Sequence, residues 1–296
     1  IDLSSLYEYS FKDKKDYVIS LDLVQKNKVS STNNELYKIN QNLDSKNYEL
    51  IIKEDTKKPI VIVHVLEEDD IININTLHIK VEKDVKASVI EVFLSNCKNT
   101  FYSVNREFDI EENANLNYFK YQDVRQSNNL IINSIINLKD KANIEHTNFE
   151  LGDGFNLNIY ETSLDNIESS LNVNGLVRLY KESHSSSIFN TVHNNKSSFS
   201  NINYKHSLHD SSKAVFEAKS IVNKNANFSK VLQNSNNDQH FIVEPNIESH
   251  SVYKLTDYKE AINKADILVY LVAHDEFKEL QLGENKVVLD FCGITK

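Results

Sequence analysis

The sequence is poor in the residues that cross-link a chain or interrupt its secondary structure. It has two cysteines, two prolines, five glycines and no methionine among its 296 residues. Cys97 and Cys292 are too few for a disulfide framework and lack CxxC spacing, which favours a reducing compartment. The absence of even an initiating methionine indicates either a chain that begins partway into a gene product or a loss of methionine positions.

Charge and hydropathy exclude two further classes of protein. The formal net charge is −10 and the isoelectric point is near 5.5, which argues against binding of a phosphate backbone. The longest apolar runs, such as residues 267–273, are far shorter than the roughly 20 residues that span a bilayer. The first residues also lack the basic and apolar regions of a signal peptide. We therefore expect a cytoplasmic protein with no nucleic-acid partner and no membrane partner.

The middle of the chain contains an internal repeat. Six segments open on a small residue and continue as alternating strands, and their openers are Ala87, Ala114, Ala142, Ser170, Ser198 and Ala226. The steps between openers are 27, 28, 28, 28 and 28 residues. A second strand lies between each pair, near residues 102–108, 130–135, 155–159, 186–192 and 214–221. This regularity is typical of a solenoid, whereas a β-sandwich would show such spacing only by chance.

The repeat predicts how its strands pack. Alternation with period two gives each strand one inward and one outward set of side chains. A unit of two strands cannot bury its apolar face alone, so it must stack on the next unit. The sequence therefore predicts a mainly β protein, a right-handed parallel β-helix with coils of about 28 residues or a flattened, two-faced version of one. The predicted inward set is Val89, Leu116, Ile144, Val173, Phe216 and Val222.

Three regions follow from this pattern: an N-terminal cap at 1–58, a β-helix at 59–237 and a partial α/β segment at 238–296. Strands are expected at 17–23, 48–52 and 59–65. In the last region we expect a strand at 241–246, a short helix at 257–266 with Ala261 and Ile262 inward, an apolar strand at 267–274 buried on both faces, a helical turn at 276–280 and a strand at 286–290. Asparagines between the repeat strands, such as Asn113 and Asn223, suit left-handed corners where glycine is scarce.

Three stretches between residues 48 and 237 resemble one known family. They are residues 48–64 with their Lys58, Pro59 and Ile60 core, the strand that opens at Ala87, and residues 192–237. The last stretch contains His193, Ser197, Tyr204, Lys205, Val215, Phe216, Lys219 and Gln233, with Ala218 where the family usually has glycine. In this order they resemble the SufB/SufD scaffolds of iron–sulfur cluster assembly, and SufD in particular. The resemblance implies a non-catalytic scaffold that acts with a SufB-like paralogue and a SufC-like ATPase. It also implies that an Fe–S cluster is handled transiently at a subunit interface. The family's Cys-Ser-His-Gly-Ala segment has no counterpart in this sequence.

Residues 240–296 resemble a different family. Val243 to Asn246, Glu260 to Asp266, Val272 to Phe277 and Asp290 to Gly293 are similar, in this order, to the UDP-binding domain of UDP-N-acetylmannosamine and UDP-glucose dehydrogenases. This resemblance implies a sugar-nucleotide-binding segment fused to the SufD-like part, as in a chimera. Because the chain has no GxGxxG dinucleotide fingerprint and no catalytic Cys motif, we predict no dehydrogenase activity from it.

A few residues are candidates for chemistry. His184, His193, His206 and His209 are close in sequence, and imidazole suits Fe, Zn or Cu, but solvent-facing or turn histidines are the alternative. His206 and His209 differ in strand parity, which argues against a shared site. Cys97 is a candidate cluster ligand or a small buried hydrophobe. His274, beside Asp275, could polarise a substrate group at the end of an α/β strand. No catalytic residue is predicted.

Overall fold

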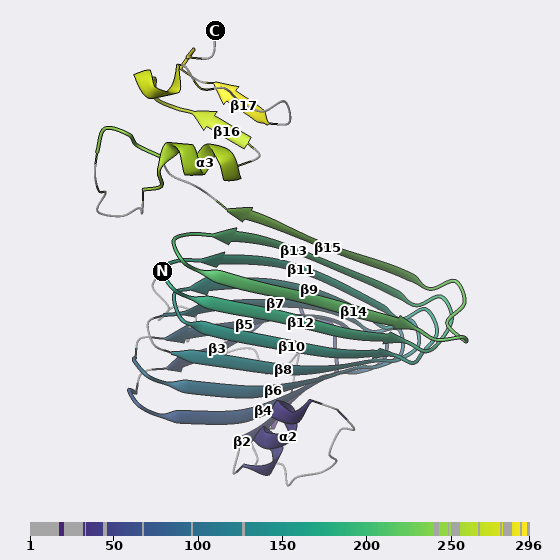
Figure 1. Cartoon of the computed structure of the whole chain (residues 1–296). Coiled ribbons are helices and arrows are strands. Elements are labelled where there is room, and N and C mark those ends of the chain that lie inside the picture. Colours follow the sequence, from purple (N-terminus) through teal and green to yellow (C-terminus); the bar gives the residue numbers. More distant parts are fainter. Residues whose placement is uncertain are drawn as a thin grey trace.

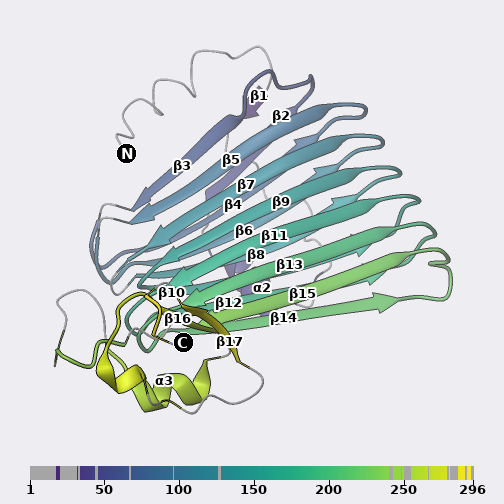
Figure 2. The same cartoon turned by 90° about the horizontal axis from the view of Figure 1, so that it is seen from above.

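The structure is a computed structural model, and it describes residues 18–20, 32, 34–43, 46–66, 68–95, 97–125, 128–239, 243–247, 249, 255–265, 267–278, 280, 286–290 and 292–294. Most of these residues form a stack of β-coils (Figure 1). Each coil contributes one strand to each of two facing parallel sheets, as the view from above also shows (Figure 2). The predicted mainly β solenoid is therefore confirmed.

Within the stack, the even-numbered strands form one sheet and the odd-numbered strands from β3 to β15 form the other. Sheet A contains β2 (Lys46–Ile52), β4 (Ile72–Val81), β6 (Phe101–Ile110), β8 (Asn129–Leu138), β10 (Phe155–Leu164), β12 (His184–His193) and β14 (Lys213–Val222). Sheet B contains β3 (Ile60–Leu66), β5 (Lys86–Ser95), β7 (Asn115–Val124), β9 (Asn143–Gly152), β11 (Ser170–Leu179), β13 (Phe199–Leu208) and β15 (Lys230–Gln239). All neighbours in both lists pair in parallel, so the second strands predicted between the openers are confirmed.

The repeat length varies around the predicted 28 residues. Ile72 pairs with Phe101, Asn129 with Phe155, and Phe199 with Lys230, so the coil lengths there are 29, 26 and 31 residues. The openers Ala114, Ala142 and Ser198 occupy the same position in their coils. The other three openers do not occupy this position. Ala87 lies two residues after it, Ser170 lies one residue after it, and Ala226 lies three residues before it. The reason is that the corners between strands differ in length.

The predicted inward set is correct except at the last coil. Val89, Leu116, Ile144 and Val173 are buried in the core, and Phe216 is half-buried against it. Val222 is 52% exposed, because it lies at the end of β14, the last strand of sheet A, where no described coil covers it.

Left-handed residues shape the corners. Among the described residues, ten that are not glycine have a positive φ, and Asn99 and Asn113 are two of them. Asn223 is not, and the other corners use Asp, Lys, Glu, Ser or Phe. Corner carboxylates also accept backbone N–H groups of a neighbouring coil, as Asp69 does from Lys98 at 2.7 Å. The prediction for asparagine therefore holds at some corners only.

The first end of the stack carries two additional elements. β1 (Val18–Ser20) pairs with β2 in antiparallel fashion, within the strand predicted at 17–23. α2 (Glu35–Asn42) is capped by Asn34, whose side chain accepts from the Tyr37 N–H, and the helix lies against the outer face of sheet A. Because β2 pairs with β4 in parallel, stacking begins inside the region predicted as a cap. No helix among the described residues is long and apolar enough to cross a membrane.

The described part of the C-terminal region contains α3 (Tyr258–Lys264), β16 (Ile267–Tyr270), the 3-10 turn η1 (Asp275–Phe277) and β17 (Val287–Asp290). β16 and β17 pair in parallel, and Ala261 is buried as predicted. The predicted apolar strand ends at Tyr270, and Ile267 and Val269 are 56% and 50% exposed. This strand was expected to be buried on both faces, but only its Leu268 and Tyr270 side chains are buried. Residues 243–247 form a turn instead of the predicted strand, and Phe241 and Ile242 lie outside the described residues.

Candidate functional site

The interior of the solenoid contains charged and amide side chains as well as apolar ones. One large cluster of buried apolar residues runs along the stack. Beside it lies a row of inward-facing, buried polar residues, which we call the polar seam: Glu91, Arg106, Lys120, Gln122, His146, Asn148, Glu150, Asn156, Asn158, Ser185, Ser187 and His206. Of these residues, only His206 was predicted from the sequence as a candidate for chemistry. Strand parity could have revealed the others, because Glu91 is two residues after inward Val89 and Glu150 is six after inward Ile144.

A buried ion pair lies at one end of the polar seam. Arg106 Nη2 lies 2.7 Å from Glu91 Oε1, and Arg106 Nε donates to the same oxygen at 2.8 Å. His64 Nε2 lies 2.7 Å from Glu91 Oε1, and the Tyr118 hydroxyl donates to Glu91 Oε2. Burial opposes ionisation of Glu91, but Arg106 and His64 outweigh it and hold the pKa of Glu91 well below its usual range. Burial lowers the pKa of His64, so Glu91 and Arg106 carry the charges here.

A second polar group surrounds Lys120. Its Nζ donates to Asn158 Oδ1 and to the Tyr160 hydroxyl, both at 2.7 Å. Glu150 Oε1 lies 3.9 Å from the same nitrogen. Burial lowers the pKa of Lys120 to about 8, although Glu150 and Glu91 act against this shift. The described charged groups of the seam therefore neutralise one another inside the stack.

The other oxygen of Glu150 links a third coil into the seam. Glu150 Oε2 accepts from the Ser185 hydroxyl at 2.9 Å and from the Ser187 hydroxyl at 3.0 Å. Asn148 donates to the Tyr204 hydroxyl at 2.7 Å. These bonds join residues of different coils, so the seam connects the coils through side chains as well as through the two sheets.

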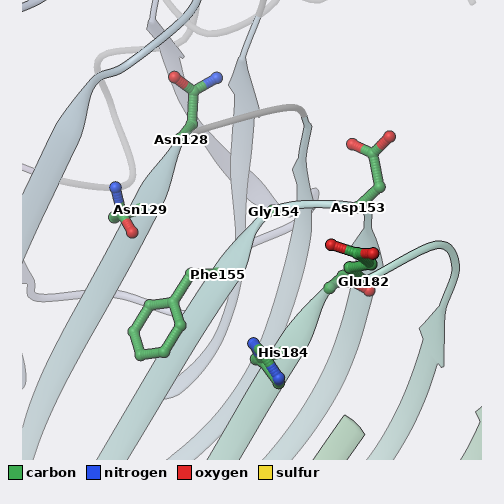
Figure 3. Close-up of a pocket in the computed structure, with 8 residues that line it drawn as sticks. Asn128, Asn129, Asp153, Gly154, Phe155, Glu182 and His184 are labelled. Carbon is green, nitrogen blue, oxygen red and sulfur yellow. The ribbon is translucent and has the colours of Figure 1, made fainter. Parts of the chain in front are cut away.

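A shallow pocket of about 180 Å³ opens on the surface where a corner is unusually short (Figure 3). Only Asp153 and Gly154 join β9 to β10, whereas four residues join β11 to β12. Gly152 has φ +111°, and a Cβ there would lie 2.0 Å from the backbone oxygen of Val124, so the tight corner needs glycine. The pocket, which we call the notch, is lined by Asn128, Asn129, Asp153, Gly154, Phe155, Glu182, Ser183 and His184.

The structure separates the predicted metal candidates. Among the described residues, no three His, Cys, Asp or Glu side chains lie close enough to hold a metal ion. His184 lines the notch, and His193 is buried, with Nδ1 2.7 Å from Ser198 Oγ and Nε2 2.8 Å from Ser200 Oγ. His206 is buried beside the rings of Tyr204 and Phe216. Burial lowers the pKa of both His193 and His206.

The remaining candidates occupy different surroundings. His209 stacks on the ring of Tyr180 at a centroid distance of 4.9 Å. Cys97 is buried at a corner, with Sγ 3.2 Å from Thr100 Oγ1, which agrees with a small buried side chain. In the C-terminal region, His274 Nδ1 lies 2.7 Å from Asn246 Nδ2, and His274 Nε2 lies 2.8 Å from Glu244 Oε1.

Comparison with known proteins identifies the family. No curated protein matches the chain. The family model of the SufBD core domain of the SUF system for FeS cluster assembly matches residues 64–252, which is almost two thirds of the chain. The match begins inside β3, includes the strands up to β15, and extends past the β-helix boundary predicted at residue 237. This chain therefore belongs to the SufBD family of iron–sulfur cluster assembly proteins.

Proposed function

We propose that this chain is a SufD-like, non-catalytic scaffold subunit that acts in the cytoplasm with a SufB-like paralogue and a SufC-like ATPase. The family match over residues 64–252 carries the proposal. The SufD-like identity rests on the order of motifs in residues 192–237, which run from the end of β12 into β15.

The second end of the stack supports a role in assembly. β14 and β15 are the last strands of sheets A and B, so one edge of each has no described strand beside it. Val215, Ile221 and Leu232 on these strands are 54%, 43% and 43% exposed. Open strand edges with apolar side chains are sites at which another chain adds a strand. A homologous solenoid is the partner that we expect at this end.

The Fe–S cluster is the cargo of such an assembly and is handled at the interface between subunits. Cys97 does not face an interface, because its side chain is buried within the chain. We therefore assign Cys97 no part in holding the cluster.

The test is coexpression of the full chain with a SufB-like protein and a SufC-like ATPase, followed by size exclusion with light scattering. We expect one complex that contains all three proteins. Ile221→Lys together with Leu232→Lys places two charges on the open edges and should abolish the complex while leaving the fold intact by circular dichroism. Val65→Lys, at a 36% exposed residue on β3 at the opposite end, is the matched control and should leave the complex unchanged. Absence of a complex with the unaltered chain would refute the proposal.

One observation favours a second candidate function, the binding of a sugar nucleotide by the C-terminal region. The structure brings His274 next to Glu244 and Asn246, so two of the dehydrogenase-like motifs meet. Calorimetry of the full chain with UDP-sugars should then show binding that His274→Ala weakens. A flat titration with the unaltered chain removes this candidate and leaves the scaffold proposal untouched.

A further inference from the structure

Two amides in the polar seam have no hydrogen-bonding partner in the structure. Both side-chain polar atoms of Gln122 and both of Asn156 are buried without a partner, and so is Nδ2 of Asn158. Gln122 and Asn156 are fully buried, and Asn158 is 1% exposed. Because both the nitrogen and the oxygen of each amide lack a partner, exchanging the two atoms by rotating the amide would not help. Burying so many polar atoms unpaired is costly, and native proteins rarely do so.

The architecture places the two amides opposite one another. Gln122 is the register partner of Glu150 in sheet B, and Asn156 is the register partner of Ser185 in sheet A. Glu150 and Ser185 bond across the interior at 2.9 Å, and one coil earlier Lys120 bonds across it to Asn158 at 2.7 Å.

In both bonds, a strand of sheet B faces the sheet A strand that comes three strands later in the chain. β7 faces β10, and β9 faces β12. Gln122 follows Lys120 by two residues on β7, and Asn156 precedes Asn158 by two residues on β10. Gln122 and Asn156 therefore face each other, just as Glu150 and Ser185 do one coil later, yet no hydrogen bond joins them.

The chemistry of the unpaired atoms selects the ligand. Three of them are amide nitrogens, which donate, and two are amide oxygens, which accept. An anion would leave the oxygens unpaired, and a cation would leave the nitrogens unpaired. Water donates and accepts, and buried water typically makes about three hydrogen bonds to such groups. The nearby charges of Lys120 and Glu150 offset one another, so neither sign of ion is favoured.

We propose that ordered water bridges Gln122 and Asn156 and forms a hydration site inside the solenoid. The water also reaches the free Nδ2 of Asn158 and completes the polar seam between Lys120 and Glu150. This site is independent of the assembly role proposed above.

A crystal structure of the full chain at high resolution tests the proposal. We expect water peaks at about 3 Å from the amide atoms of Gln122 and Asn156. A dry contact between the two side chains, or a direct bond between their amides, would overturn it.

Magnetic relaxation dispersion of water ¹⁷O gives a second readout in solution. The full chain should show long-lived internal water, and Gln122→Leu combined with Asn156→Leu should reduce it. Asn174→Leu, at an exposed asparagine on β11, is the matched control and should not. An unchanged signal in the double variant contradicts the proposal. If that variant fails to fold, the crystal structure of the unaltered chain still decides.

Discussion

Removal of Arg106 is expected to destabilise the stack strongly, because it leaves Glu91 charged and buried. Arg106 is 1% exposed and Glu91 is fully buried, so water cannot replace the lost partner. Breaking a buried ion pair from one side costs about 3–5 kcal/mol. For a protein of this size we expect Arg106→Met to lower the melting temperature by about 6–20 °C. Urea and thermal unfolding followed by circular dichroism measure both quantities.

A double variant distinguishes the cost of burying one charge without a partner from the stabilisation that the ion pair itself provides. Replacing both partners, as in Arg106→Met with Glu91→Leu, removes the unpaired charge and should recover most of the lost stability. Lys83→Ala breaks the exposed pair of Lys83 and Glu112 and serves as the control, with no change expected beyond error. If Arg106→Met loses less than about 1 kcal/mol, or if the two single losses simply add, the ion pair does not have the role described above.

Three further predictions follow from single contacts. A Cβ at Gly175 would lie 2.3 Å from the ring of Tyr204, so Gly175→Ala should cost about 1–3 kcal/mol in urea unfolding, and an unchanged midpoint contradicts the packing. Gly152→Ala should lower the stability by a similar amount, because φ is +111° and the backbone of Val124 blocks a side chain. The melting temperature measures this loss. Burial, assisted by Asp109, raises the pKa of Glu107 from 4.5 to about 7. Between these two pH values the folded state keeps a proton on Glu107 that the unfolded state has released. The stabilisation from this proton is complete below about pH 4.5 and is lost as the pH rises to about 7. Glu107→Gln should therefore make the urea midpoint vary less with pH across this window.

The sequence predicted the architecture because the solenoid is defined by local periodicity. Small openers, period-two alternation and near-constant spacing are all visible along the chain, and they led to the two stacked strand sets. The register was less accurate at Ala87, Ser170 and Ala226. Corner lengths change by a few residues without changing the strands, so a fixed step accumulates local errors even where the average is right.

The polar seam was not predicted, because its partners lie far apart in sequence. Lys120 bonds to Asn158, 38 residues later, and Glu150 accepts from Ser185, 35 residues later. Charged and amide side chains ordinarily face solvent, whereas the strand parity of Val89, Leu116 and Ile144 places those of the seam inside. Where the two signals disagreed, parity was correct, since a side chain on a regular strand must follow the pleat whatever its polarity.

A polar interior has a physical advantage in a stack of similar coils. Apolar side chains pack almost interchangeably, so an entirely apolar core would discriminate weakly between the correct neighbour of a coil and a coil shifted by one repeat. Arg106 with Glu91 and Lys120 with Glu150 are specific pairs, and a shift by one coil would bury each charge without its partner at a cost of several kcal/mol. The seam therefore penalises a misplaced coil far more than it stabilises the correct stack. Correct stacking also fixes where β14 and β15 lie, and these are the strands that the proposed partner must recognise.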